Sequence, residues 1–369
     1  MRLAILRPGP PRRYSLAPTP HDDSHDLTIW AYAFGYFAAY APYSALTKAL
    51  SGGSLPGMTH GISGFTLLPV STTASLVGMF IFLTLKGWWR YAGHREVLGL
   101  RVPMPGRWTL LSGLCSAAII GTTTLAYTLP GASIVFMMLL MRGGVLVLAP
   151  LVDVLSGRRV RWPSWLALAL SLGAVVAATG TEVSGTLTLL ATVDVGVYLT
   201  GYFFRLRAMS HLAKSGDPAV SIRYFVEEQM VATPALVGTL ALLALVGGGG
   251  DGILGELREG FTGFLARGHL LEEVLVGVLS QGTGIFGGLI LLDARENSFT
   301  VPVNRASSVL AGVVASWGLA AWLGLPGVGG RELAGASLVI VAMTVLALPT
   351  LLAARARARR EASAQVQPR

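Results

Sequence analysis

Charged residues are scarce in this chain. Only 13% of its 369 residues are charged, whereas 53% are hydrophobic, and the mean hydropathy is +0.62. A soluble domain carries about 25% charged residues, so the composition excludes an ordinary soluble globular protein. Lysine is scarcer still, because only Lys48, Lys86 and Lys214 accompany the many arginines. None of these lysines follows a glycine, which excludes the Walker A motif of an ATP-driven pump.

Cysteine and catalytic motifs are also missing. Cys115 is the single cysteine, so an intrachain disulfide is excluded, and we expect Cys115 to be a packing residue. No histidine, cysteine or carboxylate cluster has the spacing of a metal site. We therefore expect no cofactor and no enzymatic activity. The net charge of +9 is better explained as orienting a membrane protein than as binding nucleic acid.

What the chain has instead is long apolar runs. A run of about 20 residues spans about 30 Å of hydrocarbon as a helix. We predict an all-α membrane protein with ten transmembrane helices, separated by Gly-, Pro- and Ser-rich turns. The predicted spans are 27–49, 65–86, 108–128, 131–154, 163–180, 186–204, 220–246, 271–292, 299–323 and 333–353.

The basic residues orient these spans. With the N-terminus inside, Arg258, Arg267 and Arg331 are the cations of the outer segments, and the inside segments hold the others outside the spans. This alternation follows the positive-inside rule and places both termini in the cytoplasm. Residues 1–26, rich in Pro and Arg, are expected to be a disordered cytosolic tail, and 354–369 a basic cytosolic tail. The arginine-rich, lysine-poor composition suggests a GC-rich bacterial genome, hence the bacterial inner membrane.

Two of the apolar runs each carry one arginine. The runs are Gly131-ASIVFMMLLM-Arg142-GGVLVLAPLV-Asp153 and Phe299-TVPVN-Arg305-ASSVLAGVVASWGLAAWL-Gly324. Arg142 is about 16 Å into its span, near the bilayer midplane. A charge at that depth costs about 3 kcal/mol, so an intramembrane arginine indicates a functional site.

The two arginines also reveal an internal repeat. When Leu140-MRGGVLVLA-Pro150 is placed over Val303-NRASSVLAG-Val313, the arginines coincide and small residues follow both. We therefore divide the chain into two five-helix halves, residues 27–180 and 181–353. Because five is odd, the second half is inverted relative to the first. Inverted repeats are typical of secondary transporters, which bind substrate near the midplane between the halves.

The end of each half carries a family resemblance. A span, a short basic turn (Ser156-GRRVR-Trp162) and a Leu- and Gly-rich final span resemble the repeat of the drug/metabolite transporter superfamily. The EamA-like group and the solute-carrier branch with nucleotide-sugar and triose-phosphate carriers are the most similar. The resemblance covers most of residues 27–353 and implies ten spans, a central cavity and alternating access. The glutamate common in this turn of the bacterial form is absent here, so the substrate class stays open.

Arg142 and Arg305 are our first candidates for substrate contact. A guanidinium group donates bidentate hydrogen bonds to carboxylate or phosphate, which favours an anionic solute. The alternative is structural, with each arginine satisfied by backbone carbonyls or by a buried acid. Arg305, closer to the inner face, has a second alternative, since its side chain can reach the interface. Asn304, Gln281 and Tyr40 are further candidates for the substrate site.

Acidic residues in the spans are candidates for coupling or charge compensation. Asp194 is a lone acid in the sixth predicted span, where it is expensive. Glu227 is spaced to pair with Arg223, and we favour a solvated charge for it. For Glu228, proton coupling, pairing with an arginine and solvent exposure all stay open.

These patterns favour one function. We expect a secondary active or facilitative transporter that moves a small organic metabolite, plausibly anionic, by alternating access. Its expected partners are this small molecule and the lipid bilayer, and the sequence leaves a monomer or a homodimer open. The alternative is a membrane-embedded enzyme or a lipid-handling protein that uses the same intramembrane polar cavity.

Overall fold

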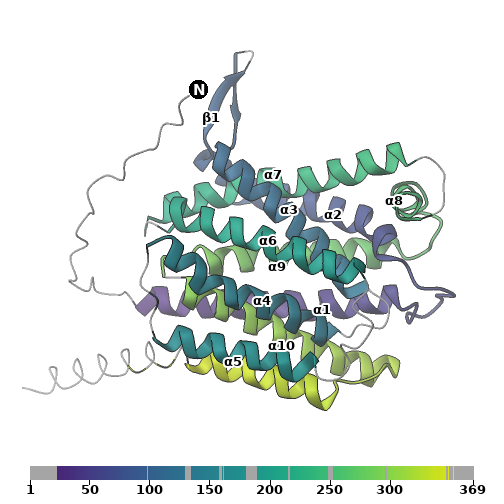
Figure 1. The fold of residues 1–369 in the computed structure, drawn as a ribbon. Coiled ribbons are helices and arrows are strands. Elements are labelled where there is room, and N and C mark those ends of the chain that lie inside the picture. Colours follow the sequence, from purple (N-terminus) through teal and green to yellow (C-terminus); the bar gives the residue numbers. More distant parts are fainter. Residues whose placement is uncertain are drawn as a thin grey trace, which may run out of the picture.

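Long helices form an antiparallel bundle in the computed structural model, which describes residues 23–345 apart from 98, 129–133, 158–159, 161, 180–188, 215–216, 248–251 and 296, and also 348 and 352. Consecutive long helices run in opposite directions across the bundle (Figure 1). They are α1 (Asp23–Ser51), α2 (Gly64–Leu85), α3 (Arg107–Thr128), α4 (Ile134–Leu155), α5 (Trp162–Thr179), α6 (Leu189–Leu212), α7 (Pro218–Val246), α9 (Leu270–Leu291) and α10 (Asn297–Leu323). Residues 330–345 form one more helix.

Seven of the described helices are long and apolar enough to cross a membrane, namely α2, α3, α4, α6, α7, α9 and α10. The lipid-accessible outside of the bundle carries large exposed hydrophobic side chains such as Leu85, Trp317 and Trp322. In water such a surface would be an aggregation hazard, whereas in a bilayer it faces hydrocarbon. The protein is therefore a helical, multi-pass membrane protein.

Most of the long helices pack against two or more other helices. α1 lies against α9 and α10, α6 lies against α3 and α4, α2 packs on α9, and α3 packs on α7. α4 also contacts α10, and α2 contacts α7. Two of these contacts need glycine. A Cβ at Gly113 would lie 2.5 Å from the Val231 side chain, and one at Gly277 would lie 2.2 Å from the Ser71 carbonyl oxygen. Small residues allow such close approach of membrane helices.

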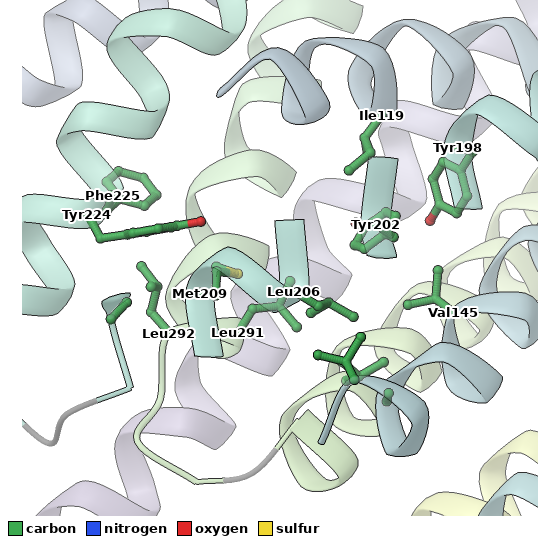
Figure 2. Packing of buried hydrophobic residues seen from close by; sticks show 14 of the residues in the cluster. Ile119, Val145, Tyr198, Tyr202, Leu206, Met209, Tyr224, Phe225, Leu291 and Leu292 are labelled. Carbon is green, nitrogen blue, oxygen red and sulfur yellow. The ribbon is translucent and has the colours of Figure 1, made fainter. Parts of the chain in front are cut away.

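The interior combines an apolar cluster with many buried polar groups. Figure 2 shows part of this cluster, to which α6 contributes Tyr198, Tyr202, Leu206 and Met209 and α4 contributes Val145. The tyrosine hydroxyls need partners in so apolar a surrounding. The bundle therefore has a polar interior that the apolar runs alone do not show.

Short elements occupy two of the segments between the predicted spans. The segment before α3 holds the 3-10 helix η1 (Trp88–Tyr91) and a hairpin of β1 (His94–Val97) and β2 (Leu100–Pro103). The segment between α7 and α9 contains α8 (Ile253–Thr262), which packs on α2 and α7. Leu257 of α8 explains this docking, since it is almost completely buried in an apolar cluster with Leu68 of α2 and Leu240 of α7.

The predicted boundaries differ in places. α1 begins at Asp23, so residues 23–26 are helical rather than part of a disordered tail. The remainder of that tail, the C-terminal tail and the junction of the two halves at 180/181 lie outside the described residues. Helix ends are the least certain part of a prediction from apolar periodicity, because polar residues continue a helix at the interface.

Candidate functional site

A central cavity of about 80 Å³ lies between the helices. Helices α1, α2, α3, α4, α6, α7, α9 and α10 all contribute lining residues. Four of the predicted site residues line this cavity together: Tyr40, Arg142, Gln281 and Asn304. The cavity has room for several water molecules, but it is smaller than the roughly 300–1,000 Å³ of pockets that enclose drug-sized ligands.

Arg142 projects from the middle of α4 into a cluster of tyrosines. Its Nη1 donates to the Tyr198 hydroxyl and its Nη2 to the Tyr40 hydroxyl, while the Tyr127 hydroxyl lies 3.4 Å from Nη2. The guanidinium carbon lies 5.2 Å and 5.3 Å from the ring centres of Tyr40 and Tyr198. The side chain is 2% exposed. Ring faces and hydroxyl oxygens thus replace the water that this cation would otherwise bind.

Arg305 occupies the corresponding place on α10. Its Nη1 donates to the Tyr198 hydroxyl at 2.8 Å and its Nη2 to the Tyr202 hydroxyl at 2.7 Å. Its guanidinium carbon lies 4.5 Å from the centre of the Tyr202 ring. The side chain is completely buried. The alternative in which Arg305 reaches the interface is therefore wrong, because its hydrogen-bond partners lie inside the bundle.

These two arginines carry positive charge that the described residues do not neutralise. Neither forms an ion pair with a carboxylate in the part of the chain that the structure describes. Their Nε atoms are buried and have no hydrogen-bond acceptor among the described residues. Tyrosine hydroxyls satisfy other donors but supply only neutral dipoles. An anion placed beside these groups would gain both unused donors and unscreened charge.

A third buried arginine lines the same cavity. Arg205 of α6 donates from Nε and Nη2 to the two carboxylate oxygens of Glu228 on α7, each at 2.8 Å. Ser112 and Ser116 of α3 donate to the same carboxylate at 2.6 Å and 3.0 Å. The Tyr224 hydroxyl is hydrogen-bonded to Ser112 at 2.5 Å. This network joins three helices and neutralises its own charge.

The network corrects two expectations. The charge count assigned Arg205 to an inside segment, but α6 continues to Leu212 and the Arg205 side chain is buried. The bidentate pair with Glu228 offsets the desolvation cost of this burial, because each group is the counter-ion of the other. Of the alternatives for Glu228, solvent exposure is wrong, since its side chain is completely buried.

The other predicted residues have weaker connections. Asn304 donates to the Gly287 carbonyl oxygen at 3.3 Å, and Gln281 donates to the Met79 sulfur at 3.3 Å. Asp194 is 4% exposed, and neither of its carboxylate oxygens has a hydrogen-bond partner among the described residues. Asp194 is therefore buried in α6 without being the counter-ion of Arg142 or Arg305.

Glu227 is structural in a different way from the one expected. The ion pair with Arg223, predicted from their spacing, is confirmed at 2.7 Å. However, a solvated charge is wrong for Glu227, because its side chain is only 3% exposed. Its carboxylate also accepts hydrogen bonds from the backbone nitrogens of Gly93 and Gly106 and from Thr109.

The sequence prediction missed two tyrosines of α6, namely Tyr198, which bonds to both arginines, and Tyr202, which bonds to Arg305. A signal for them exists. Tyr36 and Tyr40 on α1 lie one helical turn apart, as do Tyr198 and Tyr202 on α6. The two pairs have similar geometry, with ring centres 5.1 Å and 4.8 Å apart and interplanar angles of 57° and 53°. A comparison of the first spans of the two halves would have found these residues.

Comparisons with known proteins place the fold but not the activity. No family model matches this chain, and no curated protein matches it. A solved structure titled "Crystal structure of protein" is similar with a TM-score of 0.51 and 14% identity, covering 89% of this chain and 98% of that chain. A likeness at this identity concerns the fold alone.

Proposed function

We propose that this protein is a secondary transporter of the drug/metabolite type, which moves a small organic anion through the central cavity by alternating access. The proposed architecture is ten spans in two inverted halves, α1 to α5 and then α6, α7, α9, α10 and 330–345. On this proposal the protein lies in a bacterial inner membrane with both termini in the cytoplasm, as the distribution of arginines suggests.

The helix contacts support the two-half architecture. If the two halves are superimposed, α1 corresponds to α6, α2 to α7, α3 to α9, and α4 to α10. This correspondence turns the α1–α9 contact into α6–α3, the α1–α10 contact into α6–α4, and the α2–α9 contact into α7–α3. The α4–α10 and α2–α7 contacts are converted into themselves. A pseudo-two-fold axis between the halves accounts for this set of neighbours.

Individual residues also lie at equivalent places in the two halves. Gly113 makes the close contact of α3 with α7, and Gly277 makes the equivalent contact of α9 with α2. Arg142 and Arg305 lie on the two helices that meet at the proposed axis. A substrate bound near this axis is approached by equivalent helices from both halves, as alternating access requires.

The observation that carries the proposed anion is the pair of buried arginines, which have no acidic partner among the residues that the structure describes. A buried charge is normally paired, because an uncompensated one is costly. A substrate carboxylate or phosphate would supply the missing charge and accept from the unused donors. The small cavity indicates a compact conformation, which has to widen on one side to admit a metabolite.

The test begins with a thermal-shift screen of the purified protein against sugar phosphates, nucleotides, amino acids and organic cations. We expect stabilisation by anions, which are then assayed for uptake into proteoliposomes. Arg142→Ala should abolish this uptake while leaving expression and monodispersity intact. Arg258→Ala is the matched control, because Arg258 is exposed on α8, away from the cavity. Stabilisation by cations alone, or unchanged uptake by Arg142→Ala, would contradict the proposal.

We assign coupling to Glu228 first and to Asp194 second. Glu228 shares a hydrogen-bond network with Arg205, which lines the cavity. Protonation of Glu228 would therefore change the charge balance of a residue at the cavity wall. Glu228→Gln should uncouple uptake from a proton gradient while exchange of substrate for substrate continues. The enzyme alternative predicts turnover of a lipid-linked donor without any gradient, which the same purified protein can be used to measure.

A further inference from the structure

The β1–β2 hairpin projects sideways from one end of the bundle. It connects α2 to α3, both of which are apolar enough to cross a membrane. In Figure 1 it extends away from the helices at the upper left, across the direction in which they run. We call this end of the bundle the basic face, because Lys86, Arg90, Arg95, Arg101 and Arg107 lie in the segment between the two helices. Because α2 and α3 are apolar enough to cross a membrane, a hairpin that leaves their ends across the helix direction is directed along the membrane surface.

The root of the hairpin is fixed in direction. The Glu227 carboxylate on α7 accepts hydrogen bonds from the backbone nitrogens of Gly93 and Gly106, each at 3.0 Å. These two residues flank the hairpin on either side. The Gly93 carbonyl oxygen also accepts from the Met104 nitrogen, and the Trp88 ring packs edge-on against Phe225. The root of the hairpin is thus held on both of its sides, by hydrogen bonds and by ring packing.

The hairpin has two different faces. Arg95 pairs with Val102 across the strands, and Glu96 pairs with Arg101. Because side chains alternate along a strand, Leu100, Val102 and Arg95 share one face, while Glu96 and Arg101 share the other. Leu100 is 70% exposed and Val102 is 41% exposed. The described residues leave this apolar face uncovered.

The charges around that face select its partner. The five basic residues of the basic face segment accompany a single acid, Glu96. Trp108, at the start of α3, is 53% exposed and lies beside the Arg107 guanidinium. Exposed tryptophan marks the interface of a bilayer, and clustered arginines are attracted to anionic headgroups. An apolar face edged by arginine matches the boundary between acyl chains and anionic phosphates.

We infer that the β1–β2 hairpin is a membrane-surface anchor, which lays Leu100 and Val102 into the leaflet beside the basic face and binds phosphate-bearing anionic lipids through Arg95 and Arg101. Arg101 reaches the headgroups from the opposite face, as a long side chain at an interface does. The anchor goes beyond the proposed transport function and does not depend on it.

The test places a fluorescent probe on each face of the hairpin. In a Cys115→Ser background, Leu100→Cys and Glu96→Cys are labelled with an environment-sensitive dye, and single copies are put into nanodiscs of phosphatidylcholine with phosphatidylglycerol. We expect iodide quenching to be about threefold weaker at position 100 than at position 96, and quenching by nitroxide-labelled lipid to be stronger. Phosphatidylcholine alone, or the pair Arg95→Gln and Arg101→Gln, should reduce this difference. Arg258→Gln, which removes a charge from α8 rather than from the basic face, should leave the difference in quenching unchanged.

Two outcomes would overturn the anchor. Equal iodide quenching at both positions would show that the apolar face stays in water. Shielding of position 100 that is absent from single-copy nanodiscs, but present in detergent particles with two copies, would assign the face to a second copy of this chain. Because the labelled variants are compared by circular dichroism and monodispersity first, a folding defect is detected separately.

Discussion

Arg142 on α4 and Arg305 on α10 donate hydrogen bonds to the same acceptor, the Tyr198 hydroxyl of α6. Two cations thereby lie close together in a buried place, joined by a neutral group that cannot cancel their charge. Such an arrangement costs stability unless something else is gained. On the proposed function, the gain is a preformed site that recovers this cost when an anion binds.

The shared acceptor leads to a first prediction. Tyr198→Phe leaves a donor on each arginine without its partner, so thermal unfolding in detergent should show a loss of about 1–3 kcal/mol. The stabilisation by an anionic ligand should also change, because both arginines lose their orientation. Tyr43→Phe is the matched control, since its hydroxyl bonds to Thr124 rather than to either arginine. Equal effects of the two variants on the ligand-dependent shift would contradict the role of Tyr198.

The buried pair of Arg205 and Glu228 leads to a second prediction. Arg205→Gln leaves the Glu228 carboxylate buried without its counter-ion, which costs about 3–5 kcal/mol. The double variant with Glu228→Gln should recover part of this loss. Arg223→Gln removes an exposed partner of Glu227 and should cost at most about 1 kcal/mol. Chemical unfolding in a mild detergent measures all three, and equal losses in Arg205→Gln and Arg223→Gln would sink the argument.

The close helix contacts lead to a third prediction. Gly277→Val forces α2 and α9 apart, because even a Cβ would lie 2.2 Å from the Ser71 oxygen. Gly113→Val should do the same to α3 and α7. Both variants should lose most monodisperse protein in size-exclusion chromatography. Gly238→Ala, where no atom lies within 4 Å of the added Cβ, should retain it. If the halves are equivalent, the two valine variants should have similar effects.

The clamp at Glu227 leads to a fourth prediction. Glu227→Gln weakens the charge-assisted hydrogen bonds to Gly93 and Gly106, which are worth about 1.5–3 kcal/mol each. Hydrogen exchange at these two amides should therefore become roughly tenfold faster or more, while amides in α9 keep their protection. Glu96→Gln changes an exposed charge on the hairpin itself and should leave this exchange unaltered. Unchanged exchange in Glu227→Gln would show that the Gly93–Met104 hydrogen bond and the packing of Trp88 hold the hairpin without it.

Much of the membrane architecture could be predicted from the chain alone. The helices were recognisable as apolar runs long enough to span the hydrocarbon layer of a bilayer. α2, α3, α4, α7 and α9 begin and end close to the predicted residues. α6 differed most at its end. Its prediction stopped before Arg205 because a charge ordinarily ends an apolar run. Sequence order does not reveal that Glu228, on another helix, supplies the counter-ion.

The candidate site was only partly predictable. Arg142 and Arg305 were recognisable because a charge stands out in an apolar segment, and Tyr40, Gln281 and Asn304 line the cavity with Arg142. Tyr198 and Tyr202 were overlooked because tyrosine is common in membrane helices and carries no charge to attract attention. Likewise, the contribution of Glu227 to the hairpin root rests on backbone amides, which every sequence contains.

The sequence by itself determined that this is a multi-pass membrane protein and which two cations are expensive to bury, since both follow from composition along a single helix. Only the tertiary structure decided that both cations bond to one tyrosine, that Glu228 pairs with Arg205, and that Asp194 is buried with no counter-ion in the described part of the chain. The reason is geometric. Apolar length determines whether a helix enters the membrane, whereas its rotation and its neighbours determine which polar side chains meet inside.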